Sequence, residues 1–170
     1  MIATSHRLYT AAQVRQLDRY AIEQEGMPGY ELMQRAGNLA FNELLAAWPG
    51  AEQILICCGP GNNGGDGYVV ARLALEACLQ VQLIQLGDSG RIKGEAAQAR
   101  KGFLDAGGEE LAWKGALPEA DVIVDALLGT GIEREVEGDY LACIQAINSH
   151  NAAVVSLDIP SGLNADTGTP

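Results

Sequence analysis

The chain has few basic residues for its length, and few aromatic ones. Its 170 residues include 11 Lys and Arg against 22 Asp and Glu, so its net charge is −11 at pH 7. A surface this acidic argues against nucleic acid as a partner. Any phosphate-bearing ligand would have to be held by local backbone N–H groups or by a bound cation.

Long apolar runs and metal-binding cysteine patterns are also missing. No run of about 18 apolar residues occurs, so no membrane span is expected, and the N-terminus lacks the layout of a signal peptide. The four cysteines show no C-x-x-C spacing and the two histidines lie far apart, which argues against a zinc site. These absences favour a cytoplasmic protein with reduced core cysteines.

What the sequence does contain is an alternation of strand and helix patterns. Strands are expected at about residues 53–58, 81–86, 109–113, 121–125 and 152–157, with helices between them. This order predicts a Rossmann-like three-layer α/β sandwich with a mostly parallel sheet. Two extra N-terminal helices within residues 10–47, the first opened by a capping box at Thr10, are expected as an appendage.

A glycine-rich segment, residues 59–67, joins the first strand to a helix. The spacing G-x-G-x-x-G, with an acidic residue after the next strand, is the dinucleotide-binding pattern in its usual context. These residues are Gly59, Gly61, Gly64 and Asp88. No Gly-Lys-Ser/Thr follows, which excludes a nucleotide-kinase P-loop. The polar centre is unusual for a phosphate loop, and it includes Asn62, Asn63 and Asp66, the last a candidate N-cap for the helix.

Two more polar loops follow the fourth and fifth expected strands, at residues 125–131 and 156–164. The first and fourth strands are neighbours at the topological switch point of the usual strand order, where open α/β sheets bind ligands. Each loop alone has a structural interpretation, because Gly-Thr-Gly and Pro-Ser-Gly are good turn sequences. Three such loops at one edge of the sheet favour a functional site.

The carboxylates of Asp66, Asp125 and Asp158 would crowd this site. Either one of them keeps its proton or a cation lies among them. Oxygen atoms of Asn63, Asp125 and Ser161 would suit an alkali or alkaline-earth ion. Asp158, whose backbone is fixed by the Ile-Pro that follows it, is the candidate general acid and base.

Four segments together resemble the NAD(P)H-hydrate epimerase family, the YjeF N-terminal-type domain. They are residues 31–37, 61–72, 124–131 and 157–163. The string Asn-Asn-Gly-Gly-Asp-Gly within them is far more specific than G-x-G-x-x-G alone. The resemblance covers roughly residues 10–170, so residues 1–170 are interpreted as one epimerase-type domain. Because the family's domain usually continues further, we expect a truncated epimerase or the N-terminal part of a bifunctional epimerase and dehydratase.

The resemblance implies a function and a set of site residues. Its members interconvert the R and S forms of hydrated NADH and NADPH, which carry a hydroxyl at C6 of the nicotinamide ring. An ADP- or ATP-dependent dehydratase, often fused C-terminally in bacteria, then restores the coenzyme from the S form. The implied substrate-binding residues are Asn62, Asn63, Gly64, Gly65, Asp66, Gly129, Thr130, Gly131, Ile132, Glu133, Arg134, Glu135 and Asp158.

The resemblance also implies a cofactor and an assembly. Asn63, Asp125 and Ser161 would hold a potassium ion, and Asp158 would face the reactive ring. Some members are thought to use a lysine near the position of Lys114. A homo-oligomer is expected, with the amphipathic N-terminal helices as a possible support for a dimer.

Two alternatives stay open at this point. A nicotinamide-dependent oxidoreductase is favoured by the glycine spacing and Asp88, although no Tyr-x-x-x-Lys pair is evident. A non-catalytic nucleotide-binding module is favoured by the apparent truncation. The sequence does not decide between NADH and NADPH, and Asp88 hints only weakly against a 2′-phosphate.

Overall fold

The computed structural model describes residues 9–132 and 135–170. Within them lies a five-stranded, all-parallel sheet in the order β3-β2-β1-β4-β5. The strands are β1 (Gln53–Cys58), β2 (Gln80–Gln85), β3 (Glu110–Ala112), β4 (Val122–Ala126) and β5 (Ala153–Ser156). The strand order reverses between β1 and β4, which confirms that these two are neighbours at the topological switch point.

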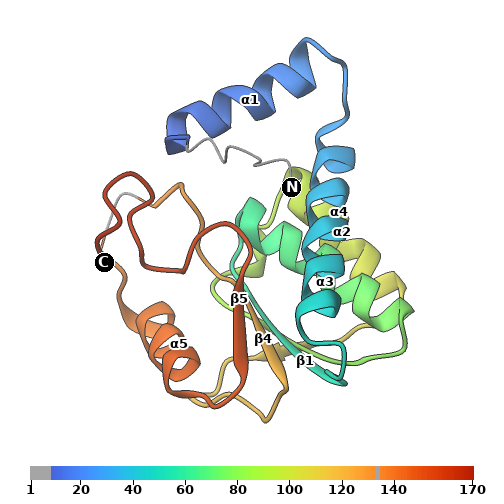
Figure 1. Cartoon of the computed structure of the whole chain (residues 1–170), viewed down its shortest axis with the longest axis vertical. Coiled ribbons are helices and arrows are strands. Elements are labelled where there is room, and N and C mark those ends of the chain that lie inside the picture. The colour runs from blue at the N-terminus through green and yellow to red at the C-terminus, as the bar shows by residue number, and fades with distance from the viewer. Residues whose placement is uncertain (1–8, 133–134) are drawn as a thin grey trace, which may run out of the picture.

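Helices cover both faces of this sheet (Figure 1). They are α1 (Ala11–Glu23), α2 (Gly29–Ala47), α3 (Asn62–Glu76), α4 (Gly94–Asp105) and α5 (Gly138–Ser149), with a short 3-10 helix η1 (Ser89–Arg91). The helices α2, α3 and α4 pack against one another on one face, and α5 covers the other. The predicted three-layer α/β sandwich is confirmed. None of the described helices is long and apolar enough to cross a membrane.

The two N-terminal helices play different parts. The predicted capping box is present in α1, because Thr10 Oγ1 accepts from the Gln13 N–H and the Gln13 side chain accepts from the Thr10 N–H. That helix buries only Ala11 and projects from the body (Figure 1). In contrast, α2 buries residues such as Met33 and Phe41 in the core. Only α1 is an appendage, because the apolar stripe of α2 packs on α3 and α4.

The centre of the sheet is buried. Every residue of β4 is buried, including Asp125, as is typical of a central strand in a parallel sheet. Three cysteines, Cys57, Cys58 and Cys143, are buried and free, whereas Cys78 is exposed after α3. The two central strands β1 and β4 therefore form a buried base for the loops at their carboxyl ends.

Candidate functional site

The glycine-rich segment forms the start of α3. The helix begins at Asn62 with Gly61 as its N-cap, so Asp66, expected as the cap, lies inside the helix and that prediction was wrong. Dense packing explains the early start: a Cβ atom on Gly64 would lie 1.9 Å from the carbonyl oxygen of Gly59. The two glycines therefore let the first turn of α3 press against the end of β1.

Three polar side chains that are distant in sequence meet beside the loop after β4. Ser161 Oγ donates to Asp125 Oδ1 at 2.5 Å, and the Ser161 N–H donates to Asp125 Oδ2 at 2.8 Å. The backbone of Leu128 joins them, because its N–H donates to Ser161 Oγ at 3.0 Å and its carbonyl accepts from Asn63 Nδ2 at 3.0 Å. The structure thus brings together Asn63, Asp125 and Ser161, the three predicted cation ligands.

This cluster is polar, buried and incompletely satisfied. Asp125 is 4% exposed, and its hydrogen-bond donors are hydroxyl and backbone N–H groups, with no Lys or Arg among those found in residues 9–132 and 135–170. Asn63 is 8% exposed, and its Oδ1 is buried without a hydrogen-bond partner in the described structure. An orphaned amide oxygen beside a buried carboxylate is costly. A cation bound there would satisfy both groups.

The loops after β4 and β5 meet directly at Asp158. Its Oδ2 accepts from the Thr130 N–H at 2.8 Å. A Cβ atom on Gly129 would lie 2.5 Å from the same oxygen and 3.3 Å from the Cβ of Asn63. The segments that follow β1, β4 and β5 therefore converge at one site at the carboxyl edge of the sheet. Asp158 is exposed at the opening of this site.

Asp66 is a second carboxyl at this place. Burial, together with the nearby carboxylates of Asp158 and Asp18, raises the pKa of Asp66 to about 7. The sequence marked Asp158 as the carboxyl that could act as an acid, and the structure adds Asp66 as a group that holds a proton near neutral pH. No motif marks Asp18, because its approach depends on where α1 lies relative to α3.

The other predicted residues at the start of α3 take two kinds of position. Asn62 is exposed, where a ligand can reach it. Gly65 is buried, and a Cβ there would lie 2.9 Å from the Cα of Ala96 on α4. The small size of Gly65 therefore serves the packing of α3 on α4.

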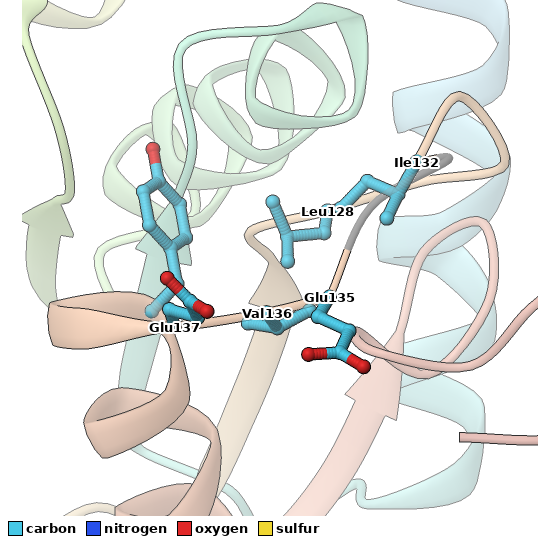
Figure 2. Close-up of a pocket in the computed structure, with 6 residues that line it drawn as sticks. Leu128, Ile132, Glu135, Val136 and Glu137 are labelled. Atoms are coloured by element: carbon cyan, nitrogen blue, oxygen red, sulfur yellow. The ribbon is translucent and has the colours of Figure 1, made fainter.

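A cavity of about 160 Å³ lies on the other side of the loop after β4 (Figure 2). It is lined by Leu128, Ile132, Glu135, Val136, Glu137 and Tyr140. Ile132 and Glu135 belong to the segment 129–135 that the resemblance implies binds the substrate, and Gly131 of that segment is exposed. Glu133 and Arg134 of that segment lie outside the described residues. Val136, Glu137 and Tyr140 also line the cavity, but no sequence motif marks them and they were not predicted.

Two further residues from the sequence lie elsewhere. Asp88 caps η1, because its Oδ1 accepts from the Gly90 N–H at 2.9 Å. This hydrogen bond gives Asp88 a structural role that is independent of the ribose contact made by the acidic residue of the dinucleotide-binding pattern. Lys114 is exposed just after β3, the edge strand furthest from β5. Its suggested role stays a prediction.

An open parallel sheet, with a glycine-rich helix start and two acidic loops at the switch point, defines a Rossmann-like ligand-binding domain. The chain belongs to the family described as YjeF-related protein N-terminus, whose profile matches residues 29–170. It is 48% identical, over 95% of its length, to the bifunctional NAD(P)H-hydrate repair enzyme Nnr of Coxiella burnetii. It is 41% identical, over 94% of its length, to the NAD(P)H-hydrate epimerase of Limosilactobacillus fermentum. The family predicted from four segments is confirmed.

The relatives differ in how much of their length the chain matches. It spans 33% of the bifunctional Coxiella burnetii protein and 76% of the Limosilactobacillus fermentum epimerase. The crystal structure of yeast YNL200c has the same fold, with a TM-score of 0.82 at 20% sequence identity. That comparison covers 97% of this chain and 75% of the yeast chain.

Proposed function

We propose that this chain is an NAD(P)H-hydrate epimerase, an isomerase that interconverts the R and S forms of hydrated NADH and NADPH. The observation that carries the proposal is the convergence of Asp66 and Asp158 beside the buried cluster of Asn63, Asp125 and Ser161. The relatives named NAD(P)H-hydrate epimerase support it, because this chain covers two thirds or more of the length of proteins such as those of Limosilactobacillus fermentum and Rhodopirellula baltica.

The proposed reaction needs an acid and a base near one carbon atom. The C6 hydroxyl of the hydrated ring is next to N1, whose lone pair can expel that oxygen once it is protonated. The C6–O bond breaks, a double bond forms between N1 and C6, and one water leaves. One water then adds to the other face of C6 and gives its proton to a carboxylate, and the lone pair returns to N1.

Asp158 and Asp66 fit these two roles. Asp158 lies at the exposed mouth, held by the Thr130 N–H, where it can reach a bound ring. Asp66 is half-buried and close enough to Asp158 for the two charges to interact. One carboxyl of such a pair keeps its proton near neutral pH while the other is ionised, which supplies an acid and a base together. The acidic surroundings would also stabilise the cationic ring intermediate.

We also propose a potassium site formed by Asn63, Asp125 and Ser161. The unpartnered Asn63 Oδ1 and the buried carboxylate of Asp125 are the observations that support it. All three side chains offer hard oxygen ligands, as alkali ions prefer. A bound monovalent cation would offset the charge of Asp125 and make the neighbourhood tolerable for the substrate's phosphates, with Gly129–Glu135 wrapping them.

Partners and location follow from the proposed activity. A dehydratase would consume the S form, and the cytoplasm, where buried thiols such as Cys57 stay reduced, would be the place of action; cell fractionation checks this. A homo-oligomer is favoured by the exposed apolar side chains of α1, which include Val14, Leu17 and Tyr20. Light scattering that gives the same mass for the native chain and for Leu17→Glu would contradict a dimer built on α1.

The direct test is the epimer ratio of hydrated NADH, followed by NMR from a sample enriched in one form. The native chain should restore the equilibrium mixture far faster than buffer alone, without producing NADH absorbance, which separates an epimerase from an oxidoreductase. Asp158→Asn should lose roughly 10²–10⁴-fold in rate and still bind the coenzyme. Glu119→Gln, an exposed carboxylate just before β4, is the control. A native rate equal to that of buffer contradicts the proposal.

A further inference from the structure

The helix α1 is attached to the rest of the structure at its two ends and is open between them. At its start, the Ala11 N–H donates to Asp166 Oδ1 at 3.0 Å. After its end, the Met27 N–H donates to the carbonyl oxygen of Ala21 at 3.0 Å, in the turn that leads into α2. Of the residues of α1, Ala11 alone is buried. The helix therefore joins the loop after β5 to the start of α2.

The segments that α1 joins lie on either side of the proposed reaction site. Figure 1 shows α1 beyond the edge of the sheet where β5 ends, with the red loop after β5 near the start of the helix. At the other end, α2 packs on α3, which begins with the glycine-rich segment. With 13 residues α1 is about 20 Å long, long enough to cross between these two segments.

Asp166 is presented to α1 by a closed turn. The side-chain oxygen of Asn164 accepts from the N–H groups of Asp166 and Thr167, both at 3.0 Å. The Gly168 N–H donates to the carbonyl oxygen of Asn164 at 2.8 Å. The first N–H groups of a helix have no partner within the helix and carry partial positive charge. The carboxylate of Asp166 therefore makes a charge-assisted hydrogen bond to the start of α1, between residues 155 positions apart in the chain.

Asp18 lies on the face of α1 that is turned toward the body. It follows Ala11 by seven residues, about two helical turns, so the two residues share one face. The carboxylate of Asp18 is close enough to Asp66 to contribute to the raised pKa of that group. Tyr20, nine residues after Ala11, lies on the opposite face and is 57% exposed. The face that carries Asp18 therefore overlooks the reaction site.

We propose that α1 is a strap across the proposed reaction site, fastened by Asp166, and that Asp18 supplies negative charge to this site. When the C6–O bond breaks, positive charge develops on the nicotinamide ring, and a carboxylate held above the ring stabilises it. Asp166 is a positioning residue, since it acts through α1. This inference rests on the proposed epimerase function and adds to it an element that no sequence motif marks.

Hydrogen exchange of the backbone amides tests the strap without catalysis. Asp166→Ala should raise the exchange rates of the α1 amides roughly tenfold or more, as expected for the loss of one charge-assisted hydrogen bond. Asp166→Asn keeps an acceptor oxygen and should retain most of the protection. The amides of β4 are the internal control, and their exchange should be the same in all variants. Equal exchange of α1 in the native chain and in Asp166→Ala overturns the strap.

Steady-state kinetics on hydrated NADH enriched in one epimer test Asp18. Asp18→Asn should lower kcat roughly three- to tenfold with little change in KM, because its charge acts on the cation that forms during the reaction. Asp18→Glu should keep most of the rate. Glu23→Gln removes an exposed carboxylate from another face of α1 and should have no effect. Asp166→Ala should lower kcat about as much as Asp18→Asn does.

The double variant of Asp18→Asn with Asp166→Ala tests whether the two residues act together. It should lose no more than the more impaired single variant, because a released strap has already removed the charge. Additive losses overturn the link between the strap and Asp18, and a native kcat in Asp18→Asn overturns the role of its charge. A native chain that does not epimerise hydrated NADH, but whose α1 amides respond to Asp166→Ala, contradicts the proposed function and keeps the strap.

Discussion

Glu110 and Asp125 are carboxylates at opposite ends of strands in the same sheet, and their surroundings differ. Glu110, at the start of β3, accepts from Arg100 Nε at 2.6 Å and from Arg100 Nη2 at 2.7 Å, and also from the Tyr68 hydroxyl. These bonds hold the pKa of Glu110 below its ordinary value. Asp125 is more deeply buried, and hydroxyl and backbone N–H groups bind it instead of a guanidinium.

Under the proposed function, the difference separates an acidic group used for stability from one kept for a ligand. The network of Tyr68, Arg100 and Glu110 joins α3, α4 and β3, and each charge in it has a partner from the same chain. Around Asp125 the described part of the chain supplies no Lys or Arg to the carboxylate and no donor to the amide oxygen Asn63 Oδ1. A site that must accept a cation or a substrate cannot be neutralised in advance.

The largest expected change in stability comes from Asp66→Asn, which tests whether Asp66 belongs with the ligand-site carboxylate Asp125 or with the structural carboxylate Glu110. The folded-state pKa of Asp66 is about 7 against an ordinary 3.8, so between about pH 4 and pH 7 the folded chain holds a proton that the unfolded chain has released. Stability therefore falls as pH rises through this window. The variant lacks this loss and should be more stable than the native chain at pH 8, by at most about 4 kcal/mol.

Urea unfolding at pH 4 and at pH 8 measures this effect, and the stability difference between variant and native chain should nearly vanish at pH 4. The same variant should lose epimerase activity, because it removes one of the two proposed proton-transfer groups. A variant that is less stable than the native chain at pH 8 would show that Asp66 is a structural carboxylate like Glu110.

Glu110→Ala is the complementary change. It leaves the guanidinium of Arg100 half-buried without its carboxylate and should cost roughly 2–3 kcal/mol in the free energy of unfolding. Activity per folded molecule should be unchanged below the melting temperature. Asp105→Ala, which breaks the exposed pair with Lys101, is the matched control and should change stability by less than about 1 kcal/mol. Loss of activity in folded Glu110→Ala would contradict a purely structural role.

Much of the fold could be predicted because it depends on local signals. The strand at residues 53–58 and the capping box at Thr10 agree with the structure residue by residue. The glycine-rich segment could not be assigned as a helix start, because polar residues such as Asn62 are typical of loops. What decides its conformation is the contact between Gly64 and Gly59, which exists only after β1 and α3 have packed.

The site shows the same limit. Sequence placed Asn63, Asp125 and Ser161 together, because parallel strands deliver their carboxyl ends to one edge. It could not place Asp18 near Asp66, since no pattern tells where a projecting helix such as α1 will lie. The hydrogen bond from the Tyr140 hydroxyl to the Leu86 carbonyl, just after β2, could not be predicted either. It joins α5 to a strand that lies beyond β4 and β1 in the sheet.

The smallest expected effect is the stabilisation of the folded chain by potassium, which tests whether the Asp125 cluster binds a cation. At about ten times its Kd, a cation that binds only the folded chain adds about 1.4 kcal/mol of stability, which raises Tm by roughly 2–6 °C. Thermal unfolding in potassium chloride and in lithium chloride at equal ionic strength measures this. Asn63→Ala, which removes the orphaned oxygen, should abolish the difference, whereas Asn38→Ala, an exposed amide on α2, should retain it. Equal melting temperatures of the native chain in both salts would mean that the buried Asp125 cluster is satisfied without a cation, as Glu110 is by Arg100.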